Sequence, residues 1–196
     1  MAHLSVHVEL AASALVAALI IGVPLAAFIA QRERIRSFAL GTVNVVRVIP
    51  SLAVLVLVLP FLGVGFRPAL LALTLLAIPP IVINTDLGLR SVPAALLDAA
   101  RGLGMTGNEI DRRVRWPLAV PIVLAGIRTA AVEVIASATL AAFIGGGGLG
   151  EYIVDGLANQ DYAELLTGAI AVAVLAILTE LAMGALARRL TAKGQP

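Results

Sequence analysis

The chain has 196 residues, of which 60% are hydrophobic, and its mean hydropathy is +1.03. This composition excludes an ordinary soluble domain and is typical of an integral membrane protein. The absence of cysteine excludes disulfides, thiolate catalysis and cysteine-based metal sites, and a net charge of +2 gives no indication of nucleic acid as a partner.

Five apolar segments are long enough, at about 20 residues each, to cross a hydrocarbon core of about 30 Å. They lie near residues 8–30, 38–61, 67–88, 118–143 and 164–187. The sequence therefore predicts an all-α membrane protein, with five transmembrane helices in a single domain over residues 1–196. The first segment does not resemble a secretory signal, because the basic run QRERIR follows it instead of preceding it.

Basic residues gather in the loops that would share one side of the membrane. Three lie in the 31–37 loop, five in the 89–117 loop and three, including Lys193, in the C-terminal tail. The 145–163 loop has three acidic residues and no basic one. The positive-inside rule then predicts an external N-terminus and a cytoplasmic C-terminus.

The longest polar interruption is residues 91–117, here called the 91–117 loop. Ser91 is a candidate N-cap, Pro93 suits a first helical turn, and the run PAALLDAAR favours a helix. Gly102 and Gly104 are expected to end this helix, because glycine readily adopts the left-handed conformation found there.

A second short helix is predicted in the same loop. Thr106 and Glu109 have the spacing of a capping box, and the helix would run to Arg115 before Pro117 opens the next span. Two short helices on the membrane surface can dock into a groove on another protein. The alternative is a solvated loop between spans.

The spacing within this loop matches a known motif. Asp98, Ala99 and Ala100 are followed after three residues by Gly104, and after nine more by the run V-R-W-P that ends at Pro117. The pattern resembles the EAA loop of bacterial ATP-binding-cassette importer permeases, written E-A-A-x3-G-x9-I-x-L-P. The resemblance implies that the loop couples the permease to an ATPase. The coupling residues would be Asp98, Ala99, Ala100, Arg101, Gly102, Gly104 and Pro117.

Further runs resemble the glycine betaine, choline and carnitine subfamily of these permeases. They are R-V-I-P-S-L at 47–52, N-T at 84–85, A-G-I-R-T at 125–129 and T-L-A-A-F-I-G at 139–145. Ile83 departs from the subfamily, which often has arginine before the N-T pair. The resemblance implies the type I importer permease fold and import of a quaternary-ammonium osmoprotectant such as glycine betaine, choline, carnitine or proline betaine.

The same resemblance implies the partners of the chain. They would be a cytoplasmic ATP-binding subunit that carries out all ATP hydrolysis, a second permease subunit and an external substrate-binding protein, assembled in the bacterial cell membrane. The chain itself would be no enzyme and would hold no cofactor or metal.

Polar groups inside the apolar segments are functional candidates, because their burial in a membrane is costly. The candidate translocation path comprises Arg47, Pro50, Ser51, Asn84, Thr85, Arg128 and Glu133. Glu180 lies at a depth similar to that of Arg47 and Arg128, so it is expected to pair with one of them, either as a structural ion pair or in substrate gating. Glu133 points about 140° away from Arg128 around the helix. Glu133 is expected either to attract a quaternary ammonium group or to be hydrogen-bonded in a helix interface.

Three apparent motifs lack the context that their chemistry requires. Residues 102–107 match G-x-G-x-x-G without a preceding strand, and the glycines at 145–148 lack the Lys-Ser/Thr of a P-loop. The chain is therefore not expected to bind nucleotides. His3 and His7 have the spacing of metal ligands on a helix, but the expectation is two interfacial histidines at a mobile terminus.

Two alternative functions remain at this point. The first is a permease of the same superfamily for another solute, such as methionine or a sulfonate. The second is an ATP-independent transporter or channel with a basic inner loop, although five spans without internal repetition argue against a secondary transporter built from inverted repeats. Energy dependence of uptake would separate the two classes.

Overall fold

The computed structural model describes residues 2–192 and contains helices joined by short turns, with no strand in that range. The helices are α1 (Ala2–Ala30), α2 (Glu33–Val48), α3 (Ser51–Leu62), α4 (Phe66–Arg90), α5 (Ala94–Gly102), α6 (Gly107–Ile110), α7 (Trp116–Ala138), α8 (Gly150–Ala158) and α9 (Tyr162–Ala192). A π-helix at Asp111–Arg115 joins α6 to α7, and a 3₁₀ helix at Thr139–Ile144 follows α7. The predicted all-α class is confirmed. Lys193 lies outside the described residues.

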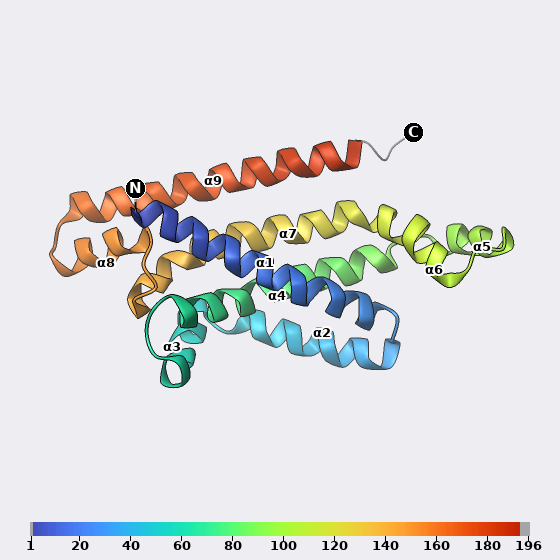
Figure 1. The fold of residues 1–196 in the computed structure, drawn as a ribbon, viewed down its shortest axis with the longest axis horizontal. Coiled ribbons are helices and arrows are strands. Elements are labelled where there is room, and N and C mark those ends of the chain that lie inside the picture. The colour runs from blue at the N-terminus through green and yellow to red at the C-terminus, as the bar shows by residue number, and fades with distance from the viewer. Residues whose placement is uncertain (1, 193–196) are drawn as a thin grey trace.

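The centre of the bundle is formed by α1, α4 and α7, which run alongside one another (Figure 1). Small residues make this possible: Ala14 on α1, Ala72 on α4 and Ala130 on α7 are fully buried. A Cβ atom on Gly22 would lie only 3.0 Å from the side chain of Ile81. Helices in a membrane gain much of their attraction from such close packing, so the alanines and glycines hold the bundle together.

The second predicted span, 38–61, is not one helix. It is divided into α2 and α3, whose axes differ by 96°. Ile49 is extended, with φ −70° and ψ 125°, and Pro50 follows it at the start of α3. The ring of a proline disfavours the helical conformation in the residue before it, which favours a turn at Ile49. Four helical runs are long and apolar enough to cross a membrane, and the bent pair would be the fifth.

The boundary predicted at Pro117 is also absent. The helix is continuous over Gly107–Ile144, a run of 38 residues, so the second helix of the 91–117 loop extends directly into the span. The wider π-helical turn at Asp111–Arg115 stands just before Pro117. It accommodates the proline, whose ring would clash with the carbonyl one turn earlier in a regular α-helix.

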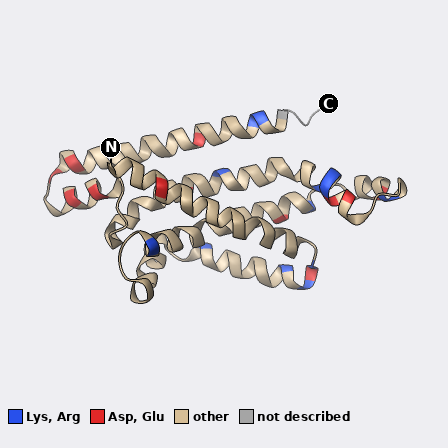
Figure 2. Ribbon diagram, viewed as in Figure 1, with Lys and Arg blue, Asp and Glu red and all other residues tan. Residues whose placement is uncertain are grey.

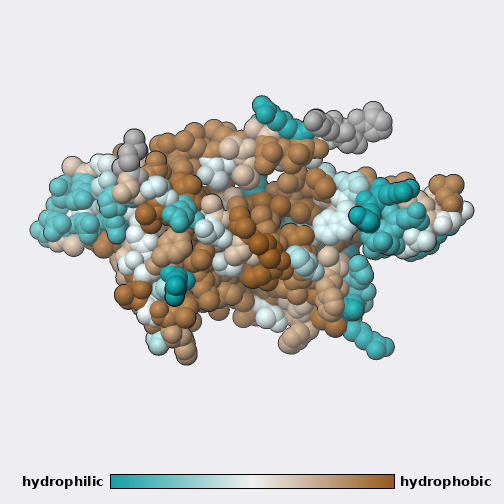
Figure 3. All heavy atoms as spheres, viewed as in Figure 1, coloured by the Kyte–Doolittle hydropathy of each residue, from teal (hydrophilic) through white to brown (hydrophobic). Residues whose placement is uncertain are grey.

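The two ends of the bundle differ in charge. The N-terminus and α8 lie at one end, whereas the α1–α2 turn, α5 and the last part of α9 lie at the other (Figure 1). Figure 2 shows acidic residues gathered around α8 and basic residues concentrated at the opposite end. An apolar band separates these ends on the face shown in Figure 3. The arrangement is that of a protein whose middle lies in lipid and whose two ends lie in water.

Candidate functional site

The 91–117 loop projects from the basic end of the bundle, and α5 is its first helix (Figure 1). Ser91 does not cap α5, contrary to the sequence-based prediction. It follows the last residue of α4, and its hydroxyl donates to the carbonyl of Gly88 over 2.9 Å. Pro93 occupies the N-cap position in an extended conformation. Because α4 continues to Arg90, the Ser91 hydroxyl bonds to a carbonyl at the end of α4. The next helix, α5, therefore begins later, at Ala94.

The end of α5 is a Schellman motif. The N–H of Met105 donates to the carbonyl of Ala100 over 3.1 Å, and the N–H of Gly104 donates to the carbonyl of Arg101 over 2.9 Å. Gly104 has φ +79°, the left-handed conformation that the motif requires, so its predicted role is confirmed. Gly102, in contrast, is the last residue of the helix.

The second helix of the loop begins with the predicted capping box. Glu109 N–H donates to the Thr106 hydroxyl, and the Glu109 carboxylate accepts from the Thr106 N–H over 2.9 Å. The Thr106 N–H and, over 2.9 Å, the Thr106 hydroxyl both donate to the Glu109 carboxylate and lower its pKa; Glu109 lies in the polar section before the apolar span. With a cap at each side, residues 103–106 form a defined turn and not a loose connection.

Most of the predicted coupling residues are on the surface of this loop. Asp98, Ala99, Arg101, Gly102, Gly104 and Pro117 are exposed. Ala100 is buried, with 5% of its surface exposed. Asp98 accepts a hydrogen bond from the Arg101 side chain over 2.6 Å. The tip of the loop carries Leu103, whose side chain is 82% exposed. An apolar tip flanked by charges is a surface that another protein can cover.

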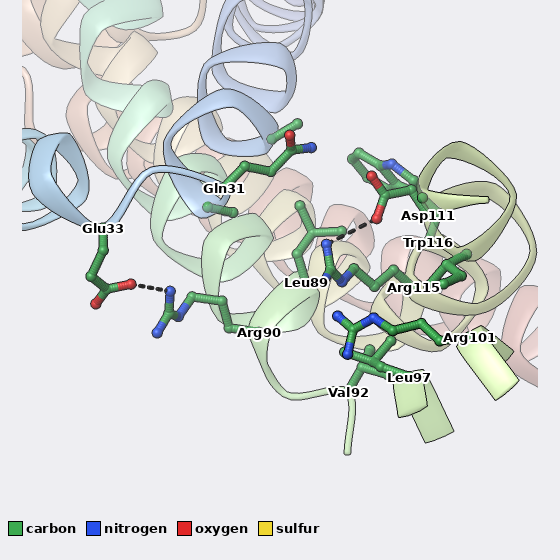
Figure 4. Close-up of a pocket in the computed structure, with 14 residues that line it drawn as sticks. Gln31, Glu33, Leu89, Arg90, Val92, Leu97, Arg101, Asp111, Arg115 and Trp116 are labelled. Carbon is green, nitrogen blue, oxygen red and sulfur yellow. Dashed lines mark hydrogen bonds and ion pairs between the residues drawn. The ribbon is translucent and has the colours of Figure 1, made fainter. Parts of the chain in front are cut away.

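A cavity of about 550 Å³ lies between this loop and the ends of α1 and α4 (Figure 4). Arg90 reaches across to Glu33 over 2.6 Å, and Arg115 pairs with Asp111 over 2.9 Å. Trp116 lies at the cavity where the loop meets the span. The loop therefore stands away from the bundle, and the polar side chains around the cavity keep it open to water.

A buried ion pair at this end was not predicted. Asp86 on α4 is 2% exposed, and both of its oxygens accept from the Arg36 side chain on α2 at 2.9 Å. Glu33 lies 3.7 Å from the same guanidinium. The signal was present in the sequence, because Asp86 is an acidic residue inside an apolar segment.

The predicted path residues fall into separate groups. Arg128 on α7 pairs with Glu180 on α9, which confirms one of the two expected partners. Arg47, Asn84 and Glu133 line one small cavity together with Thr129. The remaining residues stand apart: Thr85 is fully buried in α4, and Pro50 and Ser51 mark the bend between α2 and α3.

His7 is not an interfacial histidine, contrary to prediction. It is fully buried, and its Nδ1 accepts from the N–H of Leu149 over 3.2 Å. Nε2 must then carry the proton and donates to the carbonyl of Ile135, 3.0 Å away. Gly148, with φ +94°, packs so closely that a Cβ atom there would lie 3.0 Å from the ring. The histidine thus ties the glycine-rich segment to α1 and α7, a role that only tertiary structure reveals. His3 pairs with Glu151 over 2.6 Å.

An apolar helical bundle with charged ends and a capped polar loop at one of them defines a multi-pass membrane protein. Residues 18–192 match the family described as binding-protein-dependent transport system inner membrane component, and the chain belongs to this family.

Similar proteins include three named permeases. The carnitine transport permease protein OpuCB of Listeria monocytogenes is 41% identical over 95% of this chain and 86% of its own length. The glycine betaine/carnitine/choline transport system permease protein OpuCB of Bacillus subtilis is 42% identical over 96% of this chain and 87% of its own. The osmoprotectant import permease protein OsmW of Salmonella typhimurium is 38% identical over 96% and 90%.

Solved structures with this fold include chains of two ABC transporters. A chain of the MetNI methionine ABC transporter in an inward-facing conformation superposes with a TM-score of 0.84, at 22% identity, over 96% of this chain and 94% of that chain. A chain of an amino acid ABC transporter with histidines gives 0.75, at 21% identity, over 98% and 92%. The expected type I permease fold is confirmed.

Proposed function

We propose that this chain is the permease subunit of an ATP-driven bacterial importer of quaternary-ammonium osmoprotectants, such as glycine betaine, choline, carnitine or proline betaine. The observation that carries the proposal is 38–42% identity, over at least 95% of the chain, to permeases named for these solutes. These names favour osmoprotectants over methionine, because the likeness to MetNI is one of fold at 22% identity.

The 91–117 loop is the segment proposed to couple transport to ATP hydrolysis within one permease domain over residues 1–196. A cytoplasmic ATPase subunit would receive the exposed tip of the loop, including Asp98, Arg101 and Gly104. The Schellman motif and the capping box make the loop rigid. The cavity between the loop and the ends of α1 and α4 leaves space for the loop to move as a unit. A second permease subunit and an external substrate-binding protein complete the proposed complex.

In this arrangement the basic end of the bundle faces the cytoplasm, and the N-terminus and α8 face outward. The distribution of charge supports this orientation, since cytoplasmic loops are rich in Lys and Arg. The proposed path passes along α4 and α7, where Arg47, Asn84 and Glu133 share a cavity. The buried Thr85 and the Arg128–Glu180 pair are proposed to support the walls of the path.

The test is co-purification and uptake with the neighbouring ATPase subunit, binding protein and partner permease. We expect ATP-dependent uptake of glycine betaine by the wild type and retention of the ATPase in mild detergent. Gly104→Arg should lose both while inserting normally, because an arginine cannot easily adopt φ +79° at the loop tip. Asn159→Arg, which adds the same charge at an exposed position of the acidic end, is the control.

Two results would contradict the proposal. Uptake that proceeds without ATP would favour a channel or secondary transporter. Normal uptake and ATPase retention by Gly104→Arg would remove the coupling role from the 91–117 loop.

A further inference from the structure

A small cavity lies where α2, α4 and α7 meet. Its volume is about 90 Å³, and its lining combines two opposite charges with uncharged groups. The lining residues are Arg47, Pro80, Ile83, Asn84, Thr129 and Glu133. Arg47, Thr129 and Glu133 are exposed, so the cavity is open on their side and a solute can extend beyond it.

The two charges in this cavity lack ion-pair partners within residues 2–192, in contrast to five of the thirteen arginines there. Neither Arg47 nor Glu133 forms a salt bridge, whereas Arg36, Arg90, Arg101, Arg115 and Arg128 each do. Both belong to the apolar segments, where charged side chains are costly and mark candidate substrate paths, and the positive charge of Arg47 acts on Glu133 across the cavity.

Close packing of α4 against α7 fixes the uncharged wall. A Cβ atom on Gly126 would lie 2.5 Å from Cβ of Asn84 and 2.7 Å from the carbonyl oxygen of Pro80, so only glycine fits. The Asn84 amide donates to the Pro80 carbonyl over 2.8 Å, and the Thr129 hydroxyl donates to the Ala125 carbonyl over 3.0 Å. These bonds fix both side chains, so the wall is formed before a solute arrives.

We infer that this cavity is a transit site for a zwitterion, with the Arg47 guanidinium binding the carboxylate and Glu133 facing the quaternary ammonium. The inference rests on the proposed function and narrows its substrate class to solutes that carry both charges, such as glycine betaine. The cavity has no aromatic lining residue, so recognition of the ammonium through cation–π contacts is not available there.

The balance of charge in the cavity explains why a zwitterion would bind more tightly than a solute with a single charge. A zwitterion compensates Arg47 and Glu133 together, so the loaded cavity remains neutral as the solute passes through the membrane. A simple cation such as choline compensates Glu133 and leaves Arg47 alone, and an anion does the reverse. A guanidinium also forms two directed hydrogen bonds to a carboxylate, whereas a quaternary ammonium has no donor and needs only a negative neighbour.

Three matched ligands test this site. Glycine betaine carries both charges, choline carries the cation, and 3,3-dimethylbutyrate replaces the ammonium nitrogen of glycine betaine with carbon and carries only the anion. Each is radiolabelled, and equilibrium binding is measured on the permease–ATPase complex without the binding protein. We expect the wild type to bind glycine betaine about ten- to a hundredfold more tightly than either single-charge ligand, as for hydrogen bonds to charged groups.

Two variants assign the charges. Arg47→Gln should reduce glycine betaine binding to the level of choline, and Glu133→Gln should reduce it to the level of 3,3-dimethylbutyrate. Arg67→Gln, at an exposed arginine of the acidic end, should change nothing. Gel filtration establishes that each variant assembles.

Equal binding of the three ligands, no binding, or equal losses for all ligands in both variants would overturn the inference. ATP-dependent uptake of glycine betaine by the complete importer is measured on the same preparation. Uptake without the expected binding pattern refutes the zwitterion site alone, whereas absence of uptake refutes the proposed function.

Discussion

Two glycines that are two residues apart have different roles in the 91–117 loop. Gly104 has φ +79° and provides the left-handed position that ends α5, whereas Gly102 is helical. Neither glycine has a neighbouring heavy atom within 4 Å of where a Cβ would lie. The cost of replacing either one therefore comes from the backbone and not from a clash.

This difference predicts opposite effects of alanine at the two positions. Gly104→Ala should weaken the turn by about 1–2 kcal/mol, the cost of a left-handed alanine, and speed hydrogen exchange of the Met105 amide about 5- to 30-fold. Gly102→Ala should leave exchange unchanged or slow it, since alanine favours a helix over glycine by about 1 kcal/mol. Equal exchange in the two variants would contradict the Schellman assignment.

The pair of Arg36 and Asp86 predicts a second difference between residues. Asp86→Asn removes the charge that compensates a part-buried guanidinium and should destabilise the protein by about 3 kcal/mol. Glu33→Gln disrupts a pair whose carboxylate is 71% exposed and should cost less than about 1 kcal/mol. Thermal unfolding in mild detergent measures both, and similar losses would show that burial of Asp86 contributes little.

At the scale of elements, the sequence-based prediction was correct where the residues that determine a helix end lie close together in the sequence. Thr106 and Glu109 form the predicted capping box, and Gly104 ends the predicted helix. Prediction failed where the determinants are distant or act through shape. Pro50 was placed inside a single predicted span, because the 96° bend at this position also depends on the helices that pack against α3. The partners of His7 lie 128 and 142 residues away, beyond any local pattern.

The candidate site shows the same division. The residues of the 91–117 loop were found because they are contiguous and follow a spaced motif. A pair between Glu180 and either Arg47 or Arg128 was predicted from their depth in the membrane, and the partner is Arg128. The grouping of Arg47, Asn84 and Glu133, in contrast, depends on how three helices cross, and no single segment encodes that crossing.

The π-helix at Asp111–Arg115 predicts a sensitivity to length. Each residue in a helix contributes about 100° of rotation and 1.5 Å of rise. Deletion of Val114 should shorten this turn and rotate α5 and α6 about 100° relative to α7. We expect the variant to insert yet to lose ATPase binding and uptake. Val114→Ala, which keeps the length, should retain both activities, and uptake by the deletion variant would contradict a fixed orientation of the loop.

The whole molecule presents two chemically distinct ends, and their orientation can be mapped without background labelling because the chain has no cysteine. Asn159 is exposed at the acidic end and Asn108 at the basic end. A membrane-impermeant maleimide should label Asn159→Cys in intact spheroplasts and label Asn108→Cys only after permeabilisation. The reverse pattern would place the 91–117 loop outside, beyond the reach of a cytoplasmic ATPase.

The bond between Arg36 and Asp86 joins residues 50 positions apart, and it therefore sets an order of events during synthesis. A ribosome adds about 5–20 residues per second, so Arg36 waits roughly 2.5–10 s for its partner to be made. Throughout that interval the exposed Glu33 is the neighbouring carboxylate of Arg36, which favours a position of α2 at the water boundary. Once α4 has been synthesised, Asp86 neutralises the Arg36 guanidinium, so we expect α2 and α4 to pack into the bundle together.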